Sequence, residues 1–168
     1  NHAIVADKAI KPSKYLKKAN PQMTDREAID AARGSAASRW PIEEIIGQGY
    51  GIATAHYYDL EPDHKEGWKE GIRTTMKEAL HIATGEWSAI GAWSWGLSRI
   101  QDYLESDKDI DAKSTILIGH SRLGKTALWA GANDRRFAMV ISNNSGEGGA
   151  ALSRRNFGET IRHINTSF

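Results

Sequence analysis

A short strand, a glycine-flanked turn and a helix follow one another between residues 115 and 132, and this succession constrains the fold more than any other part of the chain. Thr115-Ile-Leu-Ile118 is a continuous apolar run, which is typical of a strand buried on both faces. Residues Lys125 to Ala132 are rich in Ala and Leu and predict a helix. Gly119 and Gly124 bracket the turn between them, and both allow the chain to change direction sharply.

The elements around this turn predict an α/β fold. A second buried strand is expected at Phe137 to Ile141, followed by a turn-rich loop from Ser142 to Gly149. Before the turn, apolar residues at helical spacing predict a helix from Trp87 to Leu104. Since strands alternate with helices, we expect a mostly parallel sheet with helices on both faces.

Four further elements are expected elsewhere in the chain. Helices are predicted over Asp25 to Arg33, from Pro41 through Ile46, and over Ala150 to Asn156. A β-branched and aromatic stretch, Tyr50 to Tyr58, lies between turn-forming residues and predicts a strand.

Residues 119 to 126 also satisfy the phosphate-binding pattern G-x-x-x-x-G-K-[ST]. A strand precedes this segment and a helix follows it, so secondary structure does not exclude a nucleotide-binding loop. The chemistry is less favourable, because the next strand is followed by Ser142, Asn143 and Asn144 and not by an aspartate for magnesium. The loop interior is also bulky where glycine would let the backbone approach a phosphate. A phosphate-loop nucleotide-binding protein remains the alternative function.

The same segment fits a nucleophile elbow, in which a serine lies on a sharp turn between strand and helix. Gly119 stands two residues before Ser121, but Leu123 occupies the place of the second glycine of G-x-S-x-G, and the glycine comes one residue later. The helix N-terminus would favour a developing oxyanion, and Arg122 adds a positive charge. Ser121 would also suit a simple helix N-cap. The residues by themselves leave both roles open.

Composition excludes several other classes of function. Lys and Arg total 22 against 21 Asp and Glu, and this balance gives no electrostatic footprint for nucleic acid or an anionic membrane. The absence of Cys removes disulfides, thiolate chemistry and Cys-ligated zinc. The histidines do not fall at ligand spacing, and no apolar run of about 18 residues occurs. We therefore expect no metal, cofactor, nucleic acid or membrane partner.

The turn and the loop after the second strand together resemble one enzyme family. Gly119-His-Ser-Arg-Leu-Gly-Lys125 followed by Ser142-Asn-Asn-Ser-Gly-Glu-Gly-Gly149 is similar to carbohydrate esterase family fifteen, the glucuronoyl esterases, in its bacterial branch. Further stretches agree, namely Asn1-His2, Arg39-Trp40, Gly49-Tyr-Gly51, Asn156-Phe-Gly-Glu159 and Ile164-Asn-Thr-Ser-Phe168. The resemblance implies an α/β-hydrolase fold. It also implies a serine carboxylester hydrolase that cleaves 4-O-methyl-glucuronate esters between xylan and lignin alcohols through an acyl-enzyme.

The resemblance implies a role for four residues. Ser121 would be the nucleophile, Arg122 would stabilise the oxyanion, and Lys125 and Glu159 would bind hydroxyls of the uronic sugar. Without the family, Lys125 and Glu159 would be interpreted as solvated surface groups. The implied partner is glucuronoxylan or a lignin–carbohydrate ester. A secreted or periplasmic location and a monomer follow as expectations.

Two departures leave the catalytic triad incomplete. Asn144 stands where members of the family carry a catalytic Glu, and Glu147, three residues further, is not expected to replace it. In α/β-hydrolases the histidine follows the serine and the acid. Only His163 follows Ser121, in a segment where a surface role is expected. A non-catalytic carbohydrate-binding remnant is therefore a third possible function.

The expected domain organisation agrees with an incomplete catalytic triad. Residues 1–168 are predicted to be the central part of one α/β-hydrolase catalytic domain, without its first strands and its C-terminal part. In such a sheet another strand should lie between the strand at Tyr50 to Tyr58 and the strand at Thr115 to Ile118. We expect the chain by itself to be inactive and poorly stable.

Overall fold

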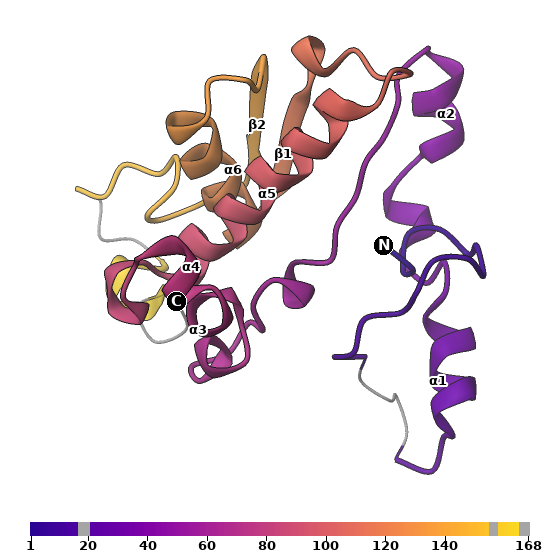
Figure 1. Cartoon of the computed structure of the whole chain (residues 1–168), viewed down its shortest axis with the longest axis horizontal. Coiled ribbons are helices and arrows are strands. Elements are labelled where there is room, and N and C mark those ends of the chain that lie inside the picture. Colours follow the sequence, from indigo (N-terminus) through magenta and orange to yellow (C-terminus); the bar gives the residue numbers. More distant parts are fainter. Residues whose placement is uncertain (17–20, 155–157, 165–168) are drawn as a thin grey trace. The chain divides into compact units, whose positions relative to one another are not determined.

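The computed structural model describes residues 1–16, 21–154 and 158–164 (Figure 1). The chain divides into two units, Asn1–Asp59 and Leu60–Phe168. The second unit contains the sheet and the predicted nucleophile turn, and the first is built from helices and loops.

A parallel two-stranded sheet forms the centre of the second unit. β1 (Ile116–His120) pairs with β2 (Met139–Asn143) in a register that places Leu117 opposite Val140. α6 (Arg122–Asn133) connects the two strands, as parallel pairing requires. This strand–helix–strand unit confirms the α/β class and both predicted strands. α6 begins three residues before the predicted start at Lys125, directly after Ser121.

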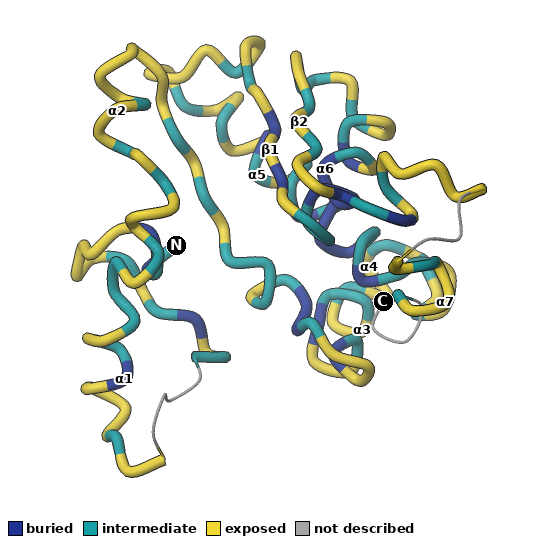
Figure 2. The backbone as a smooth tube through the Cα atoms, turned by 180° about the vertical axis from the view of Figure 1, so that it is seen from behind, coloured by how far each residue is buried: buried dark blue, intermediate teal, exposed yellow. Residues whose placement is uncertain are grey.

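One face of the sheet packs against the helices. Leu117 is buried against Ala127 and Ala130 of α6, and Leu97 of α5 (Ala89–Ser106) packs against the same cluster. Figure 2 shows buried stretches, in dark blue, along β1 and α6. α6 approaches β2 closely, because a Cβ at Gly131 would lie only 2.3 Å from Val140 Cγ2. The other face carries Ile116, Ile118, Met139 and Ile141, whose exposed fractions range from 41% to 54%.

α5 is the longest helix of the described residues and confirms the prediction from Trp87 to Leu104 within two residues. Its N-cap is Ser88, whose hydroxyl accepts a hydrogen bond from the N–H of Gly91. Two large side chains on its inner face, Trp93 and Gln101, are almost completely buried. Gln101 Nε2 donates to the Ala112 carbonyl at 2.9 Å, which ties α5 to the loop before β1.

Short elements fill the remainder of the second unit. They are η3 (Gly67–Lys69), α3 (Ile72–Thr75), α4 (Lys77–Leu80), η4 (Thr84–Glu86), η5 (Ala112–Ser114) and α7 (Ile161–Ile164). The first unit contains α1 (Asp25–Ala32), η1 (Ala37–Arg39), α2 (Ile42–Gly47) and η2 (Tyr57–Asp59). α1 starts with a capping box between Thr24 and Glu27, and both predicted helices of this unit are confirmed.

The prediction of a strand at Tyr50 to Tyr58 is wrong. Residues 50–56 have no regular structure, and η2 occupies residues 57–59. A stretch of suitable residues becomes a strand only when a neighbour accepts and donates its backbone hydrogen bonds. Among the described residues, the sheet consists of β1 and β2 alone, so this stretch has no such neighbour.

The helix predicted over Ala150 to Asn156 is also not formed in the described part of that segment. Residues 150–154 make turns and bends. The N–H of Ala150 donates to Ser145 Oγ and that of Ala151 to the Gly146 carbonyl, so the preceding loop holds these amides. Residues 155 and 156 lie outside the described residues.

A search of the described helices for a membrane-spanning segment found none of sufficient length and apolarity.

Candidate active site

Ser121 is the only residue between the end of β1 and the start of α6. Its backbone lies at φ 57° and ψ −125°, a region that residues other than glycine rarely adopt. The N–H of Ser121 donates to the Asn143 carbonyl at 2.9 Å and fixes the turn against the end of β2. The Ser121 side chain makes no capping hydrogen bond, so the alternative role as an N-cap is not observed. This strained turn has the backbone form of a nucleophile elbow.

Two glycines allow α6 to begin so close to the strand. A Cβ at Gly119 would lie 2.0 Å from the Leu123 carbonyl oxygen. A Cβ at Gly124 would lie 3.0 Å from Ser145 Cβ and 3.2 Å from the Gly119 carbonyl oxygen. The close contact on the helix therefore falls at residue 124, which explains why position 123 accepts a leucine.

The first turn of α6 places an arginine beside Ser121. Arg122 is the first residue of the helix, and its Nη1 donates to Asp63 Oδ2 at 2.5 Å. The Asp63 side chain is 3% exposed, whereas that of Arg122 is 43% exposed. Asp63 lies 59 residues before Arg122, and no local pattern in the sequence identifies it as part of the site.

Lys125 and Glu159 approach the same point of the loop after β2. A Cβ at Gly146 would lie 3.6 Å from Glu159 Oε2 and 4.0 Å from Lys125 Nζ. A Cβ at Gly148 would lie 3.7 Å from Lys125 Cε. Lys125 is buried at 7% exposure beneath this loop and is not a solvated helix lysine, while Glu159 is exposed. The two predicted sugar-binding residues therefore both approach one glycine.

The described residues do not supply a triad acid at the expected place. Asn144 directly follows β2 with a φ of 47°, and it has no carboxylate. Glu147 is buried in the loop, and its Oε2 has no hydrogen-bond partner among the described residues. No hydrogen bond connects it to Ser121 in that part of the chain.

The histidine is also missing. Within the described ranges, no side chain forms a hydrogen bond with Ser121 Oγ. His163 is exposed, and its Nδ1 accepts a hydrogen bond from the Thr160 N–H at 3.0 Å, in agreement with the predicted surface role. His120 is exposed at the end of β1. The described site therefore contains the strained turn at Ser121 with charged side chains nearby, and none of the described histidines forms a hydrogen bond with Ser121.

The geometry of the turn disfavours a phosphate-binding loop. Such a loop wraps several backbone N–H groups around an anion between the strand and the helix. Here β1 ends at His120 and α6 begins at Arg122. A search for groups of three His, Asp or Glu residues that could hold a metal ion found none in the described ranges.

Comparison with known proteins shows which family the chain resembles. The family described as "Glucuronyl esterase, fungi" matches residues 51–166. A carbohydrate esterase from an unknown prokaryotic organism is 49% identical over 172 residues, which cover all of this chain and 40% of that protein. A 4-O-methyl-glucuronoyl methylesterase from Schizophyllum commune is 42% identical over 77 residues, which cover 45% of this chain and 20% of that protein.

Solved structures of esterases are also similar to this chain. A glucuronoyl esterase from Solibacter usitatus has a TM-score of 0.80 and 46% identity, covering 99% of this chain and 42% of that one. A promiscuous CE15 esterase from a marine bacterial metagenome has a TM-score of 0.81 and 49% identity, covering 100% of this chain and 43% of that one. The chain thus spans about 40% of the length of these relatives. The chain belongs to the glucuronoyl esterase family, carbohydrate esterase family fifteen.

Proposed function

We propose that the protein containing this chain is a serine carboxylester hydrolase that cleaves 4-O-methyl-glucuronate esters between xylan and lignin alcohols. The observation that carries the proposal is the backbone of Ser121, held at a φ of 57° between a strand and a helix with no capping role for its side chain. A fold maintains such strain where a side chain must be presented in one orientation.

In the proposed mechanism, Ser121 Oγ attacks the ester carbonyl carbon and forms a tetrahedral intermediate. The negative charge that develops on the carbonyl oxygen is stabilised by N–H groups at the start of α6 and by the guanidinium of Arg122. The alcohol then leaves, and water hydrolyses the acyl-enzyme. A histidine must accept and return the proton, and an acid must orient it. We place both groups in further parts of a longer domain, because the chain spans about 40% of its relatives.

The substrate class is inferred from Lys125 and Glu159. A cation and a carboxylate that both approach Gly146 suit the hydroxyl groups of a uronic acid, since an ammonium donates hydrogen bonds and a carboxylate accepts them. The relative from Schizophyllum commune is named for a 4-O-methyl-glucuronoyl substrate. We therefore propose that these side chains select the glucuronoyl part of the ester.

Three further properties belong to the proposal. Residues 1–168 form the central part of one α/β-hydrolase catalytic domain, without its first strands and its C-terminal part. The protein acts outside the cytoplasm, secreted or periplasmic, because a cell-wall polymer is the substrate. It acts as a monomer.

Hydrolysis of a benzyl glucuronate ester by the full-length protein tests this function. The Ser121→Ala variant is expected to lose activity by a factor of about 10⁴ or more. Ser106→Ala is the matched control, because Ser106 is an exposed serine at the end of α5 whose Oγ donates only to the Tyr103 carbonyl. Loss in Ser121→Ala alone would support the esterase. An inactive parent protein would favour a non-catalytic carbohydrate-binding protein.

A further inference from the structure

Asp63 is a nearly buried carboxylate that forms an ion pair with a residue of the proposed active site. Its side chain is 3% exposed, and its Oδ2 accepts a hydrogen bond from Arg122 Nη1 at 2.5 Å. Burial of a carboxylate is costly unless the charge is paired at short range. The pairing with Arg122, the residue that follows Ser121, therefore compensates for part of the cost of burying Asp63.

The segment that carries Asp63 is held rigidly. Glu61 is fully buried, and both its carboxylate oxygens accept hydrogen bonds from Arg73 Nε, at 2.8 and 3.0 Å. The Glu61 carbonyl accepts a hydrogen bond from Trp93 Nε1 of α5 at 2.8 Å. Gly67 packs so tightly on Pro62 that a Cβ there would lie 1.9 Å from the Pro62 carbonyl oxygen. Asp63 thus extends from a fixed part of the backbone.

The exposed side chain of Arg122 requires a partner to hold it in one position. Its backbone is placed at the first position of α6, but 43% of its side chain is exposed. An arginine side chain has about 2 kcal/mol of rotamer entropy, so a half-exposed guanidinium would sample several positions. The N–H donors of a guanidinium are fixed in one plane, so a bond through Nη1 orients the whole group. A fixed carboxylate can therefore hold the guanidinium in one position.

We propose that Asp63 is a positioning residue that holds the Arg122 guanidinium where the oxyanion develops beside Ser121. The inference rests on the proposed esterase function. A stabilising group that is already oriented does not have to reorganise during the reaction, and such preorganisation acts on the transition state more than on the bound substrate. Loss of Asp63 should therefore lower kcat and leave KM nearly unchanged.

The test compares Asp63→Ala, Arg122→Ala and the double variant in the full-length protein, with benzyl glucuronate ester as substrate. Asp63→Ala is expected to lower kcat about 10- to 100-fold and to change KM by less than about threefold. In the Arg122→Ala background, the same substitution is expected to change kcat by less than about twofold. Asp63→Glu, which keeps the charge, should recover part of the lost kcat.

A matched control is available at the opposite end of α6. Asp134 is a carboxylate with 10% exposure that pairs with Arg136, far from Ser121. Asp134→Ala is expected to lower the midpoint of thermal unfolding without changing kcat, as a purely structural ion pair would. If Asp63→Ala does not fold, Asp63→Asn replaces it. This variant keeps the shape but weakens the bond to Arg122, and a kcat loss of about threefold or more is expected.

Two results would overturn the inference while leaving the esterase intact. One is a folded Asp63 variant with the kcat of the parent. The other is an equal kcat loss from Asp63→Ala with and without Arg122, since the effect would then not act through the arginine. A parent protein that hydrolyses no glucuronate ester would instead overturn the proposed function, and this inference with it.

Discussion

Ser121 combines backbone strain with the proposed chemistry in one residue. Its φ of 57° costs free energy for any side chain beyond glycine, on the order of 1–3 kcal/mol. An N-cap serine in relaxed backbone would show no such strain. The conformation therefore favours the proposed nucleophile over a simple N-cap, the two roles that the sequence motif leaves open.

The strain predicts an unusual order of stability among variants at this position. In the full-length protein, Ser121→Gly is expected to be more stable than Ser121→Ala by about 1–2 kcal/mol, and both should be inactive. At Ser106, whose φ is not positive, the same two substitutions should favour Ala. Urea unfolding measures each pair. Equal stability of the two Ser121 variants would contradict the strain.

Lys125 should discriminate between substrates with and without the sugar. Lys125→Met in the full-length protein is expected to lower kcat/KM for benzyl glucuronate ester about 10- to 100-fold, because a hydrogen bond from a charged group is lost. Hydrolysis of a simple aryl acetate should change little. Lys113→Met, which removes an exposed lysine from η5, is the control. Equal losses on both substrates would show that Lys125 supports the fold and not the sugar.

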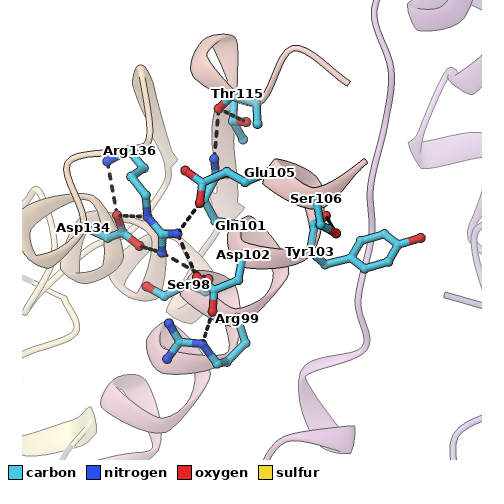
Figure 3. A network of polar contacts seen from close by, with 11 residues as sticks. Ser98, Arg99, Gln101, Asp102, Tyr103, Glu105, Ser106, Thr115, Asp134 and Arg136 are labelled. Atoms are coloured by element: carbon cyan, nitrogen blue, oxygen red, sulfur yellow. Dashed lines mark hydrogen bonds and ion pairs between the residues drawn. The ribbon is translucent and has the colours of Figure 1, made fainter. Parts of the chain in front are cut away.

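At the level of elements, an arginine joins the end of α6 to α5 (Figure 3). Arg136 donates to both carboxylate oxygens of Asp134, from Nε at 2.9 Å and from Nη2 at 2.7 Å. Its Nη1 donates to Asp102 at 2.7 Å and to Glu105 at 2.8 Å, both on α5. Hydrogen bonds from Arg136 hold the pKa of Asp134 well below its usual value. The network fixes how the two helices lie over the same face of the sheet.

This network predicts a pH-dependent difference in stability. Arg136→Met is expected to lower the free energy of unfolding by about 1 kcal/mol at neutral pH. Because the folded pKa of Asp134 is depressed, its contribution is complete above the unfolded pKa of about 4 and is lost as the pH falls below it. The difference between parent and variant should therefore shrink in acid. Urea unfolding at several pH values measures it.

The neighbouring arginine supplies the control for that measurement. Arg135 is exposed and forms no ion pair within the described ranges, so Arg135→Met removes the same charge without the network. It should leave the free energy of unfolding nearly unchanged at every pH. If the loss of unfolding free energy in Arg136→Met stayed constant down to pH 3, this result would contradict the role of Asp134.

For the molecule as a whole, the sheet leaves an apolar surface exposed. Ile116, Ile118, Met139 and Ile141 form one face of β1 and β2, and each is at least 41% exposed. A two-stranded sheet with a single covered face is marginally stable in water. We attribute the open face to the position of the chain within a longer domain, where further strands and helices are proposed to cover it.

The isolated chain should therefore unfold differently from the full-length protein. A protein of the 168 residues is expected to show a broad urea transition at low midpoint and to hydrolyse no glucuronate ester. The full-length protein should unfold cooperatively and be active under the same conditions. A cooperative transition of ordinary stability in the isolated chain would argue that it is a complete folding unit.

The sequence by itself determined the elements whose signals are local. The apolar run, the glycines and the Ala-rich stretch around Ser121 predicted a strand, a turn and a helix, and the structure confirms them. Helices α1, α2 and α5 follow in the same way from capping residues and periodicity. Their nearest contacts lie within a few residues, so a short window contains the information.

Tertiary contacts decided the remainder. Tyr50 to Tyr58 has the residues of a strand but no described partner, and a strand exists only through its partner. The pairing of Asp63 with Arg122 and the approach of Lys125 to Glu159 join segments far apart in the chain. In the sequence alone, these four residues cannot be told from ordinary surface charges. Only the folded chain gives such charges a shared position, because burial and proximity are properties of the packed structure.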